Sequence, residues 1–256
     1  MIDEKIFPFL AEKGHVISLV GGGGKTTLMY NLAAHCARKG WRVLAATTTH
    51  IMQPPGGVWA QTDAELFRLW KCGSYAVAGT AAHGGKLTAP PQAQLERWMT
   101  LADIVLIEAD GAKRMPCKVP AAHEPVLLPE SDIVLAVAGL SALGRPLREV
   151  CFRLEQACAL LGAAPETLLT PEQIKELGFC EKPVPVQGLA LVRDSLRDGT
   201  FLERFKLCDV VEDFGYHFEI IGYRHDRAEE DKRRPTVTVM TKELLPAHRM
   251  HSRSSA

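Results

Sequence analysis

The sequence predicts an α/β fold in which a mostly parallel sheet is covered by helices on both faces. Two observations predict it. Short apolar runs with β-branched centres alternate along the chain with segments of helical periodicity, which is the pattern of a parallel sheet buried on both sides. A run of glycines also joins the first apolar run to the first helical segment. A chain of 256 residues is long enough to bury a core of this kind.

The predicted strands are short apolar runs that begin or end close to a charged or glycine residue. A further apolar stretch, Val237–Met240, is predicted as an edge strand. Gly84-Gly85 predicts the turn of a small hairpin that ends near Leu87. The predicted strands of the main sheet are His15–Val20, Arg42–Ala46, Tyr75–Gly79, Asp103–Glu108, Asp132–Ala138 and Gly188–Arg193.

Three segments have the spacing or the capping signals of helices. Lys25–Lys39 repeats apolar residues at helical spacing, and Gly40 stands where a C-terminal cap belongs. Phe152–Leu161 is predicted as a second helix. Pro171–Leu177 is predicted as a third, with Thr170 as its N-cap and proline at its first position.

The composition excludes several classes of protein. Thirty Lys and Arg residues balance thirty Asp and Glu residues, so we expect no protein that coats nucleic acid through a global positive field. Seven dispersed cysteines without a C-x-x-C pair favour reduced thiols. No apolar run has the length of a signal peptide or a membrane span. The expectation is a cytoplasmic protein without a membrane partner.

The end of the chain differs in composition from the rest. Residues 223–234 are almost entirely charged, and residues 248–256 are polar. Such segments bury little apolar surface. We therefore predict one domain over residues 1–222 and a flexible, charged tail over residues 223–256.

The glycine run has the setting of a phosphate-binding loop. Gly21, Gly22, Gly23 and Gly24 are followed by Lys25-Thr26-Thr27 at the start of a predicted helix. Residues without Cβ let successive amides face one anion, and the helix dipole adds partial positive charge. Lys25 is predicted to reach the β- and γ-phosphates, and Thr26 to hold Mg²⁺. The alternative is a glycine turn followed by Lys-Thr by chance.

The run departs from two stricter patterns. G-x-x-x-x-G-K-[ST] requires glycine where this chain has Leu19, and K-G-G-x-G-K-[ST] requires lysine where it has Val20. A dinucleotide-binding G-x-G-x-x-G is not met either. The setting still predicts a three-layer P-loop NTPase-like fold with a mostly parallel sheet.

Two carboxylates follow the fourth predicted strand. At such a strand end a carboxylate faces the magnesium site, and a nearby glycine lets an amide approach the γ-phosphate. Asp110 is predicted to hold Mg²⁺ or its water, Glu108 to have a supporting or switch role, and Gly111 to contact the nucleotide. A solvated turn acid is the alternative for one of the two.

Two further segments carry candidate ligands. Thr48 and Thr49, within Thr47-Thr48-Thr49-His50, end the second predicted strand and are predicted to order around magnesium and phosphate; the β-propensity of threonine explains them equally well. Between Gly111 and Pro125, the cations Lys113, Arg114 and Lys118 suggest an anion-binding loop. Cys117 and His123 suggest contact with a soft atom, or simply a structural thiol.

Together these blocks resemble the YqeC family. The resemblance runs from about Gly14 to Thr170. It is carried by Gly21–Thr27, Thr47–Ile51, Glu108–Lys113, Met115–Lys118, Pro120 and His123–Pro125. It implies an accessory protein of selenium-dependent molybdenum hydroxylases, and a P-loop nucleoside triphosphatase of the type that serves cofactor maturation. Glu108-x-x-Gly111 also looks like the acidic switch of nickel-insertion GTPases.

The resulting expectation is an enzyme that binds Mg²⁺ with ATP or GTP, hydrolyses it, and has a molybdenum hydroxylase or its cofactor precursor as partner. Lys25, Asp110 and Glu108 are its predicted catalytic residues. A guanine-reading N-K-x-D is absent after the late strand, so the base stays open. Two alternatives remain: a kinase or nucleotidyltransferase acting on a small cofactor precursor, and a nucleotide-binding assembly protein without turnover.

Overall fold

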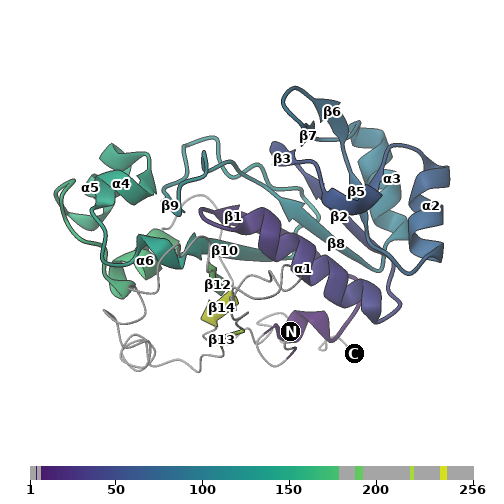
Figure 1. Ribbon diagram of the computed structural model, residues 1–256, viewed down its shortest axis with the longest axis horizontal. Coiled ribbons are helices and arrows are strands. Elements are labelled where there is room, and N and C mark those ends of the chain that lie inside the picture. Colours follow the sequence, from purple (N-terminus) through teal and green to yellow (C-terminus); the bar gives the residue numbers. More distant parts are fainter. Residues whose placement is uncertain (1–3, 5–6, 179–187, 193–219, 222–236, 241–256) are drawn as a thin grey trace, which may run out of the picture.

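The computed structural model describes residue 4, residues 7–178, and three strands at residues 188–192, 220–221 and 237–240. The described chain is a mixed α/β structure around a nine-stranded sheet (Figure 1). Its strand order is β13-β14-β12-β10-β1-β8-β2-β5-β4. The strands of this sheet are β1 (Val16–Gly21), β2 (Val43–Thr47), β4 (Trp59–Ala60), β5 (Ala76–Ala78), β8 (Ile104–Glu108), β10 (Ile133–Gly139), β12 (Gly188–Val192), β13 (Ile220–Ile221) and β14 (Val237–Met240).

The predicted parallel sheet is confirmed. All six pairings from β12 to β4 are parallel, and β14 is antiparallel to both β12 and β13. The six predicted strands of the main sheet match six of these strands to within a residue or two. Strand β1 lies between β10 and β8, so the glycines after β1 face the ends of both neighbours.

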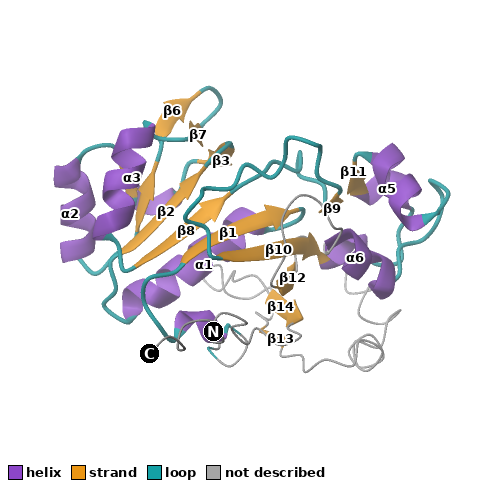
Figure 2. Ribbon diagram, turned by 180° about the vertical axis from the view of Figure 1, so that it is seen from behind, coloured by secondary structure: helices purple, strands orange, loops and turns teal. Residues whose placement is uncertain are grey.

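Helices cover both faces of the sheet, because its strands alternate their side chains between two apolar clusters. Leu28 and Leu32 of α1 pack on one face against Ile17 and Leu19 of β1. The opposite face packs against the remaining helices; Figure 2 shows the sheet in front of α1. The helices are α1 (Lys25–Arg38), α2 (Asp63–Lys71), α3 (Gln92–Leu101), α4 (Leu147–Val150), α5 (Leu154–Leu161) and α6 (Pro171–Gly178), with 3₁₀ turns at Pro8–Leu10, Pro55–Gly57 and Leu140–Ala142.

Two smaller sheets complete the described part. The predicted glycine turn lies between β6 (Thr80–Ala82) and β7 (Lys86–Thr88), with Gly84 and Gly85 at φ 72° and 68°. Strand β3 (His50–Met52) pairs with β7. The second sheet pairs β9 (Cys117–Lys118) with β11 (Cys151–Phe152) in parallel, so the predicted helix at Phe152 begins two residues later, at Leu154.

Several element predictions need correction or stay open. Val237–Met240 is a strand, but it pairs on both sides and is not an edge. Helix α2 was not predicted, although Thr62 and Glu65 form the capping box that opens it. The N-cap at Thr170 is confirmed, because its hydroxyl accepts the Gln173 amide at 3.3 Å. Most of the predicted tail and its boundary at residue 222 lie outside the described residues.

Candidate functional site

The glycine loop, Gly21–Gly24, joins the end of β1 to the first turn of α1. Gly21 has φ 99°, and a Cβ there would lie 2.4 Å from the carbonyl oxygen of Val137 on β10. A Cβ on Gly22 would lie 2.5 Å from the carbonyl oxygen of Pro116. Both approaches are closer than any side chain allows. Glycine is therefore required at both positions by neighbouring backbone.

Glu108 lies beside the start of α1 because β8 pairs with β1, with Leu19 opposite Glu108. The Thr26 hydroxyl donates to Glu108 Oε2 at 2.6 Å, and Lys25 Nζ lies 3.9 Å from its other oxygen. Burial raises the pKa of Glu108 and outweighs the opposing effects of Lys25 and the Thr26 hydrogen bond. A hydroxyl and a carboxylate so paired are the donor set that a hard cation such as Mg²⁺ prefers.

Asp110 lies over the first glycine and between two lysines. Its carboxylate accepts the Gly21 amide at 3.0 and 3.1 Å. Lys25 Nζ lies 3.1 Å from one oxygen, and Lys118 Nζ lies 2.9 Å from the other. The side chains of Asp110 and Lys118 are 1% and 0% exposed. Asp110 thus has its oxygens engaged by protein cations, whereas Glu108 faces the Thr26 hydroxyl.

The charges continue beyond Lys118 in alternating sign. Glu124 accepts from Lys118 at 2.5 Å and from Arg153 at 2.8 Å. Burial would raise the pKa of Glu124, but the hydrogen bonds from Arg153 and Lys118 and their charges lower it to about 2. We call Lys25, Asp110, Lys118, Glu124 and Arg153 the charge ladder. Lys118 was predicted as a loop cation, and its pairing with Glu124 and Arg153 was not predicted. Nothing in the local sequence pattern marks Lys118 as buried.

The loop Gly111–Lys118, called the covering loop, contacts the glycine loop directly. The Met115 carbonyl accepts the Gly23 amide at 3.0 Å, and Val137 accepts the Gly22 amide at 2.8 Å. Lys113 and Arg114 are exposed and have left-handed φ values of 47° and 64°. Such backbone strain concentrates at functional sites. In the described structure, the amides of Gly22 and Gly23, which were predicted to bind phosphate, thus donate to backbone carbonyl oxygens.

The threonines after β2 are turned toward the protein itself. The Thr47 hydroxyl is buried and donates to the Glu108 carbonyl at 2.8 Å, and it accepts the Thr49 amide at 3.0 Å. The Thr48 hydroxyl donates to the Val126 carbonyl at 2.7 Å. These contacts fix the end of β8, which carries Glu108. Direct contact of Thr48, Thr49 or the exposed Thr27 with a ligand stays a prediction.

Cys117 and His123 lie in different environments. Cys117 is buried on β9 and in register with Cys151 of β11, whereas His123 is exposed. Among the described residues, no group of three or more His, Cys, Asp or Glu side chains could hold a metal ion. The structure therefore gives the soft-metal hypothesis no cluster within this part of the chain.

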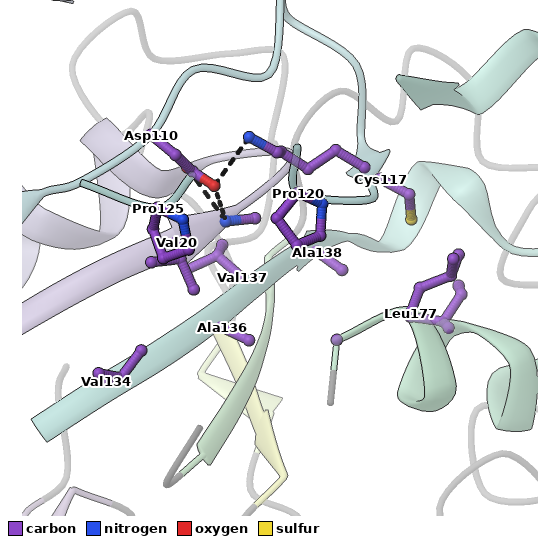
Figure 3. Close-up of a pocket in the computed structure, with 14 residues that line it drawn as sticks. Val20, Asp110, Cys117, Pro120, Pro125, Val134, Ala136, Val137, Ala138 and Leu177 are labelled. Carbon is purple, nitrogen blue, oxygen red and sulfur yellow. Dashed lines mark hydrogen bonds and ion pairs between the residues drawn. The ribbon is translucent and has the colours of Figure 1, made fainter. Parts of the chain in front are cut away.

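A small pocket opens behind the glycine loop (Figure 3). Its walls are apolar and come largely from β1 and β10, including Val20, Val134 and Ala136. Asp110 and Lys118 form its polar end, and Leu177 of α6 lies at the far side, as Figure 3 shows for Asp110 and Leu177. Gly21 of the glycine loop also lines this pocket, beside Asp110 and Lys118 of the charge ladder.

Comparison with known proteins gives a family and no solved relative. The model of the YqeC protein family matches residues 17–155, which contain the glycine loop and the whole charge ladder. The chain belongs to the YqeC family. A relative from Escherichia coli strain K12, bearing the name "Uncharacterized protein YqeC", is 32% identical over 211 residues, or 76% of this chain and 77% of its own length. No solved structure matches.

The YqeC match also covers α1, β8, the covering loop and β1 from Ile17 onward, so the residues that build the site lie within the family region. Within the described residues, no helix has the length and apolarity needed to cross a bilayer.

Proposed function

We propose that this YqeC-family protein binds a nucleoside triphosphate with Mg²⁺ at the glycine loop and hydrolyses it. The observation that carries the proposal is the pairing of Thr26 with Glu108 directly beyond four glycines, next to the buried Lys25. A hydroxyl one residue after the lysine and a carboxylate on the adjacent strand are the parts that such sites use for the metal.

We assign the metal to Thr26 and Glu108. The sequence reading favoured Asp110 for this role, but the Asp110 oxygens face Lys25, Lys118 and the Gly21 amide. Bound Mg²⁺ would neutralise charge on the phosphates as it develops. Binding requires an ionised Glu108, and its burial makes that ionisation costly until the cation arrives.

The remaining groups would act on the phosphates. Lys25 would stabilise negative charge on the transferring phosphoryl group. The Gly22 amide is held by the Val137 carbonyl of β10, so the Gly23 amide would donate to a phosphate oxygen. For this, the Met115 carbonyl must leave Gly23. The Gly111–Met115 part of the covering loop therefore has to move when nucleotide binds, and Lys113 and Arg114 would move with it toward the new anion.

The cellular role that we propose comes from the family resemblance. Turnover would assist maturation of a selenium-dependent molybdenum hydroxylase, with that enzyme or its cofactor precursor as partner. The nucleotide is ATP or GTP.

The two alternatives use the same phosphate site. For a kinase or nucleotidyltransferase, Thr47–Thr49 and Lys113–Lys118 would hold the acceptor, yet Thr47, Thr48 and Lys118 are engaged within the protein. For an assembly protein without turnover, binding would occur without release of phosphate. Phosphate release, and transfer of label to a small molecule, distinguish the three functions.

The decisive experiment is calorimetric titration of ATP and GTP, with and without Mg²⁺, into wild type and Lys25→Ala. We expect wild type to bind one nucleotide and the variant to lose binding at least 100-fold, because a charge contact to phosphate is removed. Asp110 keeps Lys118 as partner in the variant, so the fold should survive. Lys71→Ala on α2 is the matched control, since Lys71 is exposed. Equal affinity of wild type and Lys25→Ala would contradict the proposal.

A further inference from the structure

The buried carboxylate of Asp110 pairs with two lysines that lie at different oxygens of it and differ in their proposed roles. Lys25 Nζ lies 3.1 Å from one oxygen and Lys118 Nζ lies 2.9 Å from the other. All three side chains are at most 5% exposed. Lys25 belongs to the proposed phosphate site, whereas Lys118 sits on β9 with its ammonium directed to Asp110, Glu124 and the Gly111 carbonyl.

Nucleotide binding, as proposed above, draws Lys25 toward phosphate. If Lys25 were the only partner of Asp110, its departure would leave a buried carboxylate without a counter-charge, which is strongly unfavourable. With Lys118 at 2.9 Å the carboxylate keeps a cation when Lys25 leaves. It also keeps the Gly21 amide, so the first glycine of the loop stays in place.

We propose that Lys118 is a positioning residue that compensates Asp110 and so releases Lys25 to the nucleotide. The inference rests on the proposed function. Lys118 need not touch the ligand; it acts through Asp110, and it sets the nucleotide affinity by lowering the cost of breaking the Lys25–Asp110 pair.

Glu124 gives this inference a second, opposite consequence. Glu124 competes with Asp110 for Lys118, at 2.5 Å against 2.9 Å. If Glu124 is neutralised, the charge of Lys118 serves Asp110 more fully. Asp110 then holds Lys25 less strongly, and nucleotide should bind more tightly. Removal of Lys118 should do the reverse.

The experiment measures affinity for AMP-PNP or GMP-PNP, whichever wild type binds, in the presence of EDTA. Without metal, any role of Asp110 toward Mg²⁺ does not enter. We expect Lys118→Met to lower affinity at least about tenfold, and Glu124→Gln to raise it about two- to tenfold. The double variant Asp110→Asn/Lys118→Met should return to within about threefold of wild type or bind more tightly, because no carboxylate then retains Lys25. Lys86→Met, at an exposed lysine of β7, is the control.

The outcomes separate the two proposals. If wild type and the Lys86→Met control bind no nucleotide even when Mg²⁺ is supplied, the proposed function itself fails; if they bind only with Mg²⁺, the same variants are compared in its presence. If wild type and Lys118→Met bind nucleotide equally, the positioning role is overturned. It is also overturned if Glu124→Gln weakens nucleotide binding as Lys118→Met does. If the charge ladder had only a structural role, both variants would weaken nucleotide binding. Should Lys118→Met not fold, the Glu124→Gln and double variants decide: tighter binding by the first and near-wild-type binding by the second support the role, and weaker binding by either overturns it.

Discussion

At the scale of single residues, the site is a set of charges that satisfy one another. Lys25 donates to the Gly21 carbonyl at 2.6 Å and pairs with Asp110, while Thr26 donates to Glu108. Buried charged groups persist only when paired in this way. A ligand bound at this site would therefore replace existing contacts, and its affinity would reflect the difference between the partners lost and the partners gained.

Glu124, the second carboxylate of the charge ladder, gives a pH-dependent prediction. The pKa of Glu124 is lowered from 4.5 to about 2 in the folded protein. Ionised Glu124 therefore stabilises the fold fully above about pH 4.5, and this contribution disappears as the pH falls toward 2. We expect Glu124→Gln to lower the free energy of unfolding at pH 7 and to have a smaller effect at pH 4 and pH 3, measured by urea denaturation.

A control for this pH profile is Glu130→Gln, at an exposed residue a few positions along the chain. It should have little effect at any pH. A destabilisation by Glu124→Gln that stays constant from pH 7 to pH 3 would mean that Glu124 acts through packing and not through its charge.

At the scale of elements, the covering loop and the glycine loop are fitted to each other. Pro116 accepts the Gly139 amide at 2.7 Å, and the same carbonyl oxygen faces Gly22. We predict that Gly22→Ala lowers the free energy of unfolding by about 1–3 kcal/mol, because a Cβ at 2.5 Å forces backbone apart. Urea denaturation measures this directly.

Gly111→Ala is the matched control for this fit. Gly111 lies in the covering loop, yet a Cβ there meets nothing within 4 Å and needs no left-handed backbone. It should change stability little, or raise it slightly by restricting the unfolded chain. Equal destabilisation by Gly22→Ala and Gly111→Ala would show that the close approach of Pro116 does not matter.

The elements also show what sequence could predict. Strand and helix patterns gave the main sheet and α1, since long apolar periodicities dominate there. Short strands such as β9 and β11 escaped prediction because two residues carry no periodicity. Lys25, Thr26, Glu108 and Asp110 were predicted as neighbours from strand ends alone. The different partners of Glu108 and Asp110 were not predicted. They depend on Lys118, which the β9–β11 pairing holds in the interior beside Asp110.

At the scale of the whole molecule, the site lies at the carboxyl ends of the parallel strands, between the two faces of the sheet that helices cover. Leu19 and Val20 of β1 face opposite apolar clusters, and the next residue begins the glycine loop. Open α/β sheets bind ligands at this edge, where backbone groups no longer pair within the sheet. The equal numbers of acidic and basic residues fit this arrangement, since the charge is concentrated locally.

The glycine loop joins the central strand to α1, so a ligand that binds there requires the folded chain. Such a ligand would stabilise the folded chain by mass action. At a concentration about 100 times the dissociation constant, the gain is about 2.7 kcal/mol, which corresponds to a rise in Tm of roughly 5–10 °C for a protein of this size. We expect ATP or GTP with Mg²⁺ to give this rise in a thermal-shift panel. Thr26→Ser, which keeps the hydroxyl, should retain the Mg²⁺-dependent part, and Thr26→Val, which removes it, should lose that part. A rise that is equal with and without Mg²⁺, or equal in both variants, would count against the metal site that we propose at Thr26 and Glu108.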